Sequence, residues 1–414
     1  MASIIGAFVT FTLVVVLIML LRPFSIMTGL VDRPNARSSH MKPTPLVGGL
    51  AIFVAVSIGY VLPAIMGPLP ITTEIVSYFA AGLLLVAIGV VDDYRPLPTS
   101  ARFVAQIFAS LIMIYGGGVV LTDLGGMGFS GQFIYLGWLS VPFTVFATLG
   151  VINALNMCDG LDGLSGTLSL VSIAGLLIAS YLGGAVTEAY MLLLLAVSVV
   201  GFLLFNWRLP GRDSAVIFMG DAGSMFLGLS LTWFAISLSQ GAGRIITPAA
   251  ALWFLMLPIF DTIAMIVRRV KRKQSPFAPD KEHIHHVFVM SGFTVNETVI
   301  MMAAGAMIGA GIGLLSLDLD APEFSIAGLF VIAGLLYMWM MIKAWKVMLF
   351  IERSFCRRRG DRRAGFDRRQ FNDSSTFEED RRLGNDRRQS QRRRLIDGEK
   401  PIEVDEQPVT EVRE

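Results

Sequence analysis

Eleven apolar runs follow one another along this sequence, and each is bounded by charged residues or by Gly, Pro and Asn. A helix needs about 20 consecutive apolar residues to cross the hydrocarbon layer of a membrane, and the runs approach or reach that length. The sequence therefore predicts an all-α polytopic membrane protein with about 11 transmembrane helices. The predicted spans are residues 3–21, 47–66, 75–91, 103–120, 136–153, 165–183, 187–206, 222–239, 247–267, 297–316 and 324–346.

Charge separates the chain into two parts. Residues 1–350 hold 17 basic and 17 acidic residues, whereas residues 351–414 hold 17 and 15, so that half of this tail is charged. The formal net charge of +2 therefore comes from the tail, and it indicates no basic groove for nucleic acid. We expect a transmembrane domain at 1–350 and a tail at 351–414 with repeated Asp-Arg-Arg triplets. Few large apolar residues and heavy charge predict that the tail is disordered.

The basic residues also predict the orientation of the spans, because Lys and Arg near span ends stay preferentially on the cytoplasmic side. With the N-terminus outside, sixteen of the 17 basic residues in 1–350 fall inside, and only Arg244 falls outside. We therefore expect an external N-terminus and a cytoplasmic C-terminus. Cys158 and Cys356 both fall on the inner, reducing side, so no disulfide is expected.

Two acidic motifs stand at predicted span ends. Asp92 and Asp93 follow the third run, and Gly220-Asp221-Ala-Gly-Ser224 opens the eighth. An ionised carboxylate near the membrane is costly to insert, so it usually has a function. The acids could bind a cation, or one of the pair could act as a base. Two structural alternatives stay open: the pair could cap the helix expected near Ser100, and Asp221 could cap the eighth helix.

A polar segment joins the fifth and sixth runs. It reads Asn153-Ala-Leu-Asn156-Met-Cys-Asp159-Gly-Leu-Asp162-Gly163, in a predicted inside loop. Its polar residues recur every three positions, so on a helical turn they would share one face. Amide and carboxylate oxygens are hard ligands suited to Mg²⁺. The segment predicts a magnesium site, with a structural polar helix end as the alternative.

Cations and histidines gather on the same predicted side. The basic run 268–273 precedes His283-Ile-His285-His286, whose rings could donate to phosphate. A zinc site is the competitor, but no second thiol or acid lies at ligand spacing beside these histidines. In the first inside loop, Arg37, His40 and Lys42 could receive an anionic headgroup. A simple role in fixing topology stays open for both basic segments.

All of these motifs fall on the predicted inner face, whereas unrelated caps and anchors should scatter over both faces. We therefore expect one site at the cytoplasmic membrane surface that combines metal ligands, phosphate-binding cations and adjoining lipid. This combination suits phosphoryl transfer from a soluble anionic donor to a lipid-borne acceptor. A secondary transporter is the alternative from another class. Its substrate site would lie near the midplane, but the spans are nearly free of ionisable groups except near their ends.

Taken in order, the motifs resemble those of a known family. They are residues 31–40, 45–49, 92–93, 153–164, 220–224, 258–262 and 283–286. Over roughly residues 30–300 the chain resembles the polyprenyl-phosphate N-acetylhexosamine-1-phosphate transferases, glycosyltransferase family 4. The His-Ile-His-His form is similar to the WecA/TagO-like branch, which uses UDP-N-acetylglucosamine, rather than to the related MraY branch.

The resemblance implies an activity and a set of roles. A lipid phosphate attacks the sugar-bearing phosphate of a UDP-sugar, giving a lipid-diphosphate sugar and UMP, with Mg²⁺ as cofactor and Mn²⁺ as a substitute ion. The implied roles are catalysis for Asp92, Asp93 and Asp159; metal binding for Asn156 and Asp221; nucleotide binding for Asn153 and Asp162; and sugar-diphosphate binding for His283, His285 and His286. Charge and placement make Arg37, His40 and Lys42 the candidates for the lipid phosphate.

The resemblance also implies a place and partners. We expect a multi-pass protein of the bacterial cytoplasmic (inner) membrane that uses undecaprenyl phosphate at its cytoplasmic face and starts a lipid-linked surface glycan. UDP-FucNAc, UDP-QuiNAc and UDP-MurNAc-pentapeptide stay open as donors besides UDP-GlcNAc. A homodimer stays open as well. The tail is either a solvated appendage or an interaction segment for anionic lipid or for later pathway enzymes.

Deleting residues 357–414 is expected to leave transfer activity intact, because the tail matches no part of the family core. The measurement is the turnover of the purified truncated and full-length proteins in detergent. A substantial loss of activity in the truncated protein would contradict this prediction.

Overall fold

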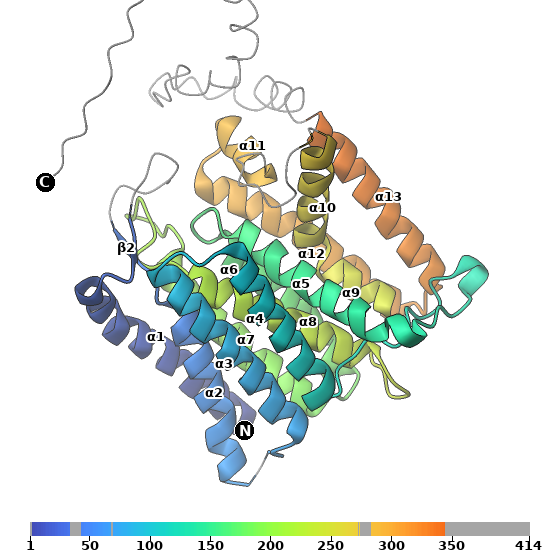
Figure 1. The fold of residues 1–414 in the computed structure, drawn as a ribbon, viewed down its shortest axis with the longest axis horizontal. Helices are drawn as coiled ribbons and strands as arrows, with labels where there is room; N and C mark the ends of the chain where they lie inside the picture. The colour runs from blue at the N-terminus through green and yellow to red at the C-terminus, as the bar shows by residue number, and fades with distance from the viewer. Residues whose placement is uncertain (1, 34–42, 68, 272, 274–282, 344–414) are drawn as a thin grey trace, which may run out of the picture. The chain divides into compact units, whose positions relative to one another are not determined.

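The computed structural model describes residues 2–33, 43–67, 69–271, 273 and 283–343, which form a helical bundle (Figure 1). Ten of the described helices are long and apolar enough to cross a membrane, and a bent helix pair makes eleven if it counts as one span. The prediction of an all-α polytopic membrane protein is confirmed. The helices are α1 (Ala2–Thr28), α2 (Gly48–Ile65), α3 (Thr73–Tyr94), α4 (Thr99–Leu111), α5 (Ser140–Cys158), α6 (Leu164–Leu182), α7 (Val186–Asn206), α8 (Gly220–Ser239), α9 (Pro248–Phe254), α10 (Met256–Lys271), α11 (Ile284–Met290), α12 (Val295–Asp318) and α13 (Glu323–Ile342).

The ninth predicted span is broken. The run expected as one helix at 247–267 forms α9 and α10, which are bent by 80° at Leu255. The expectation of one continuous helix is wrong because the run contains two helix starts. Pro248 lies at the start of α9, and Pro258 lies in the first turn of α10. Proline fits a first turn, where its missing N–H removes no helical hydrogen bond, but it disrupts a helix interior.

Two helices extend beyond their predicted ends into the candidate motifs. α5 runs to Cys158, so Asn153 and Asn156 lie on a helix and not in the predicted loop, which shrinks to residues 159–163. α3 runs to Tyr94, so Asp92 and Asp93 belong to its last turn. Polar side chains at these helix ends bond to neighbouring helices. A prediction from hydropathy alone therefore places the ends of both helices too early.

The central helix of the bundle is α8. In an apolar 18-residue stretch of α8, 94% of the residues are buried, whereas the share in the corresponding stretch of α13 is 11%. Large apolar side chains such as Phe8, Ile308 and Leu336 are exposed, at 69%, 65% and 63%. This pattern suits helices whose outer faces meet lipid, since a soluble protein rarely exposes contiguous apolar surface on this scale.

Glycines let the first turn of α8 approach its neighbours closely. A Cβ on Gly89 of α3 would overlap the backbone of Ala222, and one on Gly49 of α2 would overlap the backbone of Gly223. Only glycine fits where two backbones come this close, because a backbone atom cannot turn aside as a side chain can. The start of α8 is thereby held against both α2 and α3.

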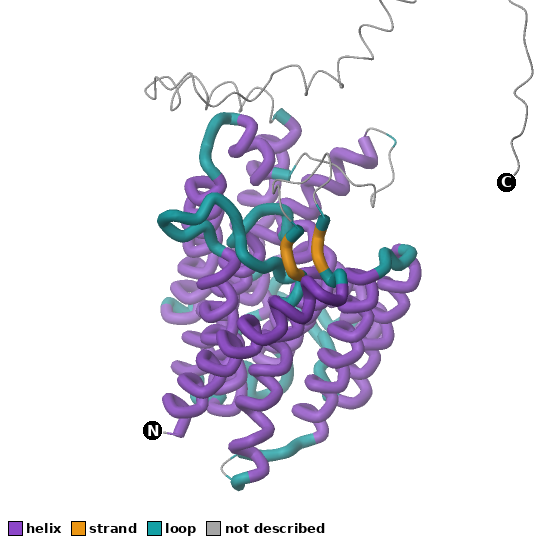
Figure 2. The backbone as a smooth tube through the Cα atoms, turned by 90° about the vertical axis from the view of Figure 1, so that its left-hand side faces the viewer, coloured by secondary structure: helices purple, strands orange, loops and turns teal. Residues whose placement is uncertain are grey.

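A small strand pair lies beside this point. β1 (Val31–Asp32) pairs antiparallel with β2 (Thr44–Pro45). The N–H of Phe218 donates to the carbonyl of Pro45 at 2.8 Å, and the N–H of Gly48 donates to the carbonyl of Phe218 at 3.0 Å. These bonds tie the residues before α8 to the start of α2. The strands lie toward the end of the bundle away from the N-terminus (Figure 2).

Substituting Gly89→Ala should destabilise the fold by the roughly 1–3 kcal/mol typical of overpacking, because the new methyl group meets backbone. Gly311→Ala on α12 is the matched control, since a Cβ there meets nothing within 4 Å. Alanine also favours a helix interior over glycine. The measurement is the midpoint of thermal unfolding in detergent. Equal midpoints for the Gly89→Ala variant and the wild type would show that the close approach of α3 and α8 is unimportant.

Candidate active site

Candidate residues from α3, α5 and α8 meet at the first turn of α8. The Asp93 carboxylate accepts the backbone N–H of Asp221 at 2.8 Å and that of Ala222 at 3.4 Å. These first-turn N–H groups have no partner within their own helix. Asp93 therefore caps α8 from a neighbouring helix. The alternative that the acidic pair caps the helix near Ser100 is wrong, because Asp93 bonds α8 and Asp92 accepts the N–H of Leu97, which lies before the cap residue Pro98 of α4.

Asn156 on α5 joins this cluster through its amide group. Its Nδ2 donates to the Asp221 carboxylate at 2.5 Å and to the Ser224 hydroxyl at 3.0 Å. The amide NH₂ is thus committed to α8, and the amide oxygen is the atom that Asn156 has left to offer a ligand. The alternative that Asp221 caps α8 is also wrong, since it lies within the first turn and the cap residue Met219 makes no side-chain cap bond.

Arg102 on α4 supplies positive charge to the cluster. One guanidinium nitrogen lies 3.2 Å from Asp92 Oδ2 and 3.5 Å from Asp221 Oδ2. The other oxygen of Asp92 accepts the backbone N–H of Leu97 at 2.6 Å. The two adjacent acids therefore have different partners: Asp92 bonds the turn after α3 and Arg102, whereas Asp93 bonds the first turn of α8. Sequence reasoning counted Arg102 only as an inside cation, and its spacing from the acids carried no signal of this contact.

Asn153 lies one turn before Asn156 and faces α4. Its Nδ2 donates to Oε1 of Gln106 at 2.7 Å and to the carbonyl of Leu149 at 2.8 Å. Gln106 is 2% exposed. Sequence reasoning missed this glutamine, although an amide within an apolar span was an available signal.

The loop after α5 holds two carboxylates in different surroundings. Asp159 accepts a hydrogen bond from the Ser165 hydroxyl. Burial raises the pKa of Asp159 to about 6, against the lowering effect of that bond. Asp162 Oδ2 accepts from Arg208 Nε at 2.7 Å and from the N–H of Ala215 at 2.9 Å. Asp162 is thus tied to the segment between α7 and α8, and its nucleotide-binding role stays a prediction.

The histidine segment is anchored to α10 and to the loop after α5. His283 Nδ1 lies 2.7 Å from Asp261 Oδ2. The rings of His283 and His285 stack with centroids 5.4 Å apart. Nε2 of His285 lies so near Gly160 that an added Cβ would come within 2.7 Å of it. The histidine segment and the Asn153–Gly163 segment are therefore in direct contact, and His286 packs beside them with its ring 4.3 Å from that of His285.

The three lipid-phosphate candidates, Arg37, His40 and Lys42, lie outside the described residues, as does the tail. Their roles stay predictions.

The cluster at the start of α8 contains hard oxygen donors, which are the ligands that Mg²⁺ prefers. Among the described residues, no group of three or more His, Cys, Asp or Glu side chains is arranged to hold a metal ion. Mg²⁺ needs no such group, because it keeps several waters and is bound by one or two carboxylates together with substrate phosphates. The Asp221 carboxylate and the amide oxygen of Asn156 have the chemistry that such an ion requires.

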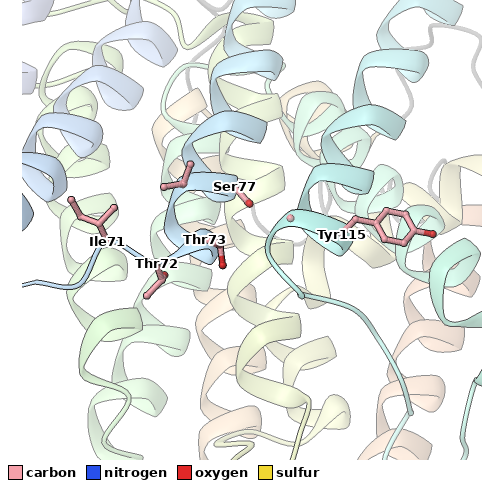
Figure 3. Close-up of a pocket in the computed structure, with 7 residues that line it drawn as sticks. Ile71, Thr72, Thr73, Ser77 and Tyr115 are labelled. Carbon is pink, nitrogen blue, oxygen red and sulfur yellow. The ribbon is translucent and has the colours of Figure 1, made fainter.

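A cavity of about 580 Å³ lies elsewhere (Figure 3). Thr72, Thr73 and Ser77 line it at the start of α3, and Tyr115 lines it from the short helical turn after α4. Asp92 and Asp93 lie at the opposite end of α3. This cavity is therefore separate from the cluster at α8.

Comparison with known proteins gives a consistent result. The sequence profile of glycosyl transferase family 4 matches residues 75–239. The undecaprenyl-phosphate alpha-N-acetylglucosaminyl 1-phosphate transferase of Yersinia pestis is 34% identical over 333 residues, which cover 80% of this chain and 89% of the relative. The protein of the same name from Haemophilus influenzae is 34% identical over 84% of this chain and 96% of the relative. The Salmonella typhi protein is 33% identical over 83% and 92%.

His285 should make stability depend on pH. Its burial, more than the neighbouring histidines, lowers its pKa to about 3, whereas an unfolded histidine has a pKa near 6.5. Below pH 6.5 the unfolded chain takes up a proton that the folded chain does not. The contribution to folding is therefore present above pH 6.5 and is lost as the pH falls, by up to about 1.4 kcal/mol per pH unit.

The wild type should accordingly lose more unfolding free energy between pH 7.5 and pH 5 than the His285→Gln variant, whose side chain does not titrate. The measurement is unfolding by denaturing detergent at both pH values. Equal losses in the two proteins would contradict the burial of a neutral His285.

Proposed function

This chain belongs to glycosyl transferase family 4, and on that premise we propose that it transfers N-acetylglucosamine 1-phosphate from UDP-N-acetylglucosamine to undecaprenyl phosphate. The three relatives described above, which carry this activity in their names, match 80–84% of the chain with identities of 33–34%. The observation that carries the proposal is the meeting of Asp93, Asn156 and Asp221 with Arg102 at the start of α8. This arrangement supports phosphoryl transfer because it sets oxygen donors and a cation side by side.

The reaction is a displacement at phosphorus. An oxygen of the lipid phosphate forms a bond to the sugar-bearing phosphorus of the donor. The bond from that phosphorus to the bridging oxygen of the diphosphate breaks, and the oxygen leaves with UMP. The product is a lipid-diphosphate sugar. A protein contributes to such a reaction chiefly by positioning the reactants and by balancing charge.

Asn156 and Asp221 would hold Mg²⁺, or Mn²⁺ in its place, through their amide and carboxylate oxygens. When bound, the ion neutralises charge on the diphosphate and on the leaving group. Asp93 keeps these ligands in register by holding the first turn of α8. Arg102, whose side chain is 30% exposed, can bind a phosphate oxygen in exchange for its carboxylate partners.

The remaining candidates take the other parts of the substrates. Asn153 and Asp162 would contact the nucleotide, and His283, His285 and His286 would contact the sugar and the diphosphate. Contact between His285 and the loop at Gly160 supports one continuous surface for these parts. Asp92, Asp93 and Asp159 are the acids proposed to take part in catalysis, Asp93 in addition to its bonds to α8.

We place the reaction at the cytoplasmic face of a bacterial inner membrane, from the distribution of basic residues around the spans. Undecaprenyl phosphate enters from the bilayer and the UDP-sugar from the cytoplasm. Other UDP-sugars stay open as donors. Assembly as a homodimer and binding of partners by the tail also stay open. The transporter alternative loses its support, because the family and the relatives are transferases.

Asp221→Asn and Asn156→Ala should lower turnover and raise the Mg²⁺ concentration that it requires. The expected loss is at least the roughly 10- to 100-fold seen when an outer partner of a metal ligand is removed. Asp213→Asn is the matched control, because Asp213 is exposed in the segment before α8. The measurement is the release of UMP from UDP-N-acetylglucosamine in the presence of undecaprenyl phosphate, with purified protein.

Parallel reactions with other UDP-sugars would identify the donor. Wild-type turnover in both Asp221→Asn and Asn156→Ala would refute the metal assignment. Absence of UMP release by folded wild-type protein with every donor would refute the function.

A further inference from the structure

The last helix, α13, contacts through one hydroxyl group the carboxylate of Asp261, which bonds the histidine segment. Most of α13 is exposed or half-buried, and Phe330 and Met341 are its buried residues. The hydroxyl of Tyr337 nevertheless donates to Asp261 Oδ1 on α10 at 2.9 Å. Figure 1 shows α10 and α13 side by side, and the two helices are in contact. A helix that mainly faces lipid thus places a polar group against a carboxylate that is 1% exposed.

Asp261 holds the histidine segment with both of its oxygens. Oδ2 lies 2.7 Å from Nδ1 of His283, and Oδ1 also accepts the backbone N–H of Ile284 at 3.3 Å. Ile284 is the first residue of α11, where an N–H has no partner within the helix. Asp261 therefore caps α11 from a different helix and orients the ring of the preceding histidine.

The bond at Nδ1 determines what His283 can offer a substrate. A neutral imidazole that donates from Nδ1 keeps Nε2 as an acceptor, and a protonated ring presents a second N–H there. The carboxylate can impose this choice only if its own plane is fixed. Tyr337 fixes that plane together with the N–H of Ile284, because both donate to Oδ1 while His283 bonds Oδ2, and the hydroxyl makes the shorter of the two bonds to Oδ1.

We propose that Tyr337 is a positioning residue for the transfer: it fixes the Asp261 carboxylate, which sets the tautomer and direction of the His283 ring. The inference rests on the proposed function, in which His283 faces the sugar and diphosphate. Outer partners of this kind orient functional histidines in many sites. A purely structural Tyr337 would anchor α13 and would leave His283 unaltered.

Kinetics of the Tyr337→Phe variant give the first test. Removing this hydroxyl should lower kcat/KM for UDP-N-acetylglucosamine about tenfold, in line with the loss of one buried hydrogen bond to a charged group. Tyr78→Phe is the matched control, because the hydroxyl of Tyr78 is also buried and bonds Ser230 at 2.8 Å. Tyr78 lies on α3, about 21 Å along the helix from Asp92. The control should retain wild-type kcat/KM.

A double-mutant cycle tests whether the effect passes through Asp261. Tyr337→Phe should cost little further activity in an Asp261→Asn protein, because residues in one hydrogen-bond network are not additive. Additive losses would overturn the proposal.

The ring of His283 gives a readout that does not depend on the donor. The chain has four histidines, so ¹⁵N-histidine labelling yields few ring signals, and a His283→Gln variant assigns the relevant ones. The wild type should show His283 protonated at Nδ1, and Tyr337→Phe should change its signals while Tyr78→Phe does not.

Unchanged His283 signals in Tyr337→Phe would overturn the proposal, and so would changed signals with wild-type kcat/KM. If no donor yields UMP even with the wild type, while Tyr337→Phe alters the His283 signals, the proposed function fails and the positioning contact stands.

Discussion

A carboxylate on one helix completes the backbone hydrogen bonding of another at the point where the candidate site forms. Asp93 on α3 accepts two N–H groups from the first turn of α8. Because α8 is almost entirely enclosed, leaving a buried donor without a partner there would cost about 1–3 kcal/mol. The same bond holds the backbone of Asp221, whose side chain bonds Asn156. The positions of the proposed metal ligands, Asn156 and Asp221, therefore depend on the bond between the Asp93 carboxylate and the backbone of Asp221.

This contact brings negative charges together inside a membrane protein. Asp92, Asp93 and Asp221 lie around the start of α8, and Arg102 pairs with two of them. A cluster of this kind is costly unless cations are close. Under the proposed function, the metal ion and the substrates meet a surface whose charges are already held in position. That is the form of preorganisation on which phosphoryl transfer chiefly relies.

The sequence predicted much of the fold because spans depend on local composition. Runs of apolar residues located every membrane-crossing helix of the described chain to within several residues, and Pro248 and Pro258 in the ninth run were available signals of its break. The end of α5 could not be found in this way, since Asn153 and Asn156 continue the helix through bonds to α4 and α8.

The candidate site was predictable in its residue types but not in its contacts. Polar motifs at span ends pointed to the acids, amides and histidines. The partners of those groups are distant in sequence: 128 residues separate Asp93 from Asp221, and 76 separate Asp261 from Tyr337. The hydrophobic periodicity of a sequence does not indicate such pairings, because they form only when helices pack against one another. Arg102 and Tyr337 were missed for this reason, whereas the amide of Gln106 within an apolar span was an available signal.

In the proposed reaction the sugar-bearing phosphorus moves from the nucleotide to the lipid. UDP-N-acetylglucosamine labelled with ³²P at the sugar-bearing phosphate, incubated with purified protein and undecaprenyl phosphate, separates the alternatives in one experiment. We expect the label to pass into the lipid fraction and the released nucleotide to be unlabelled UMP. Label that leaves as UDP while sugar alone reaches the lipid would contradict the proposed transfer.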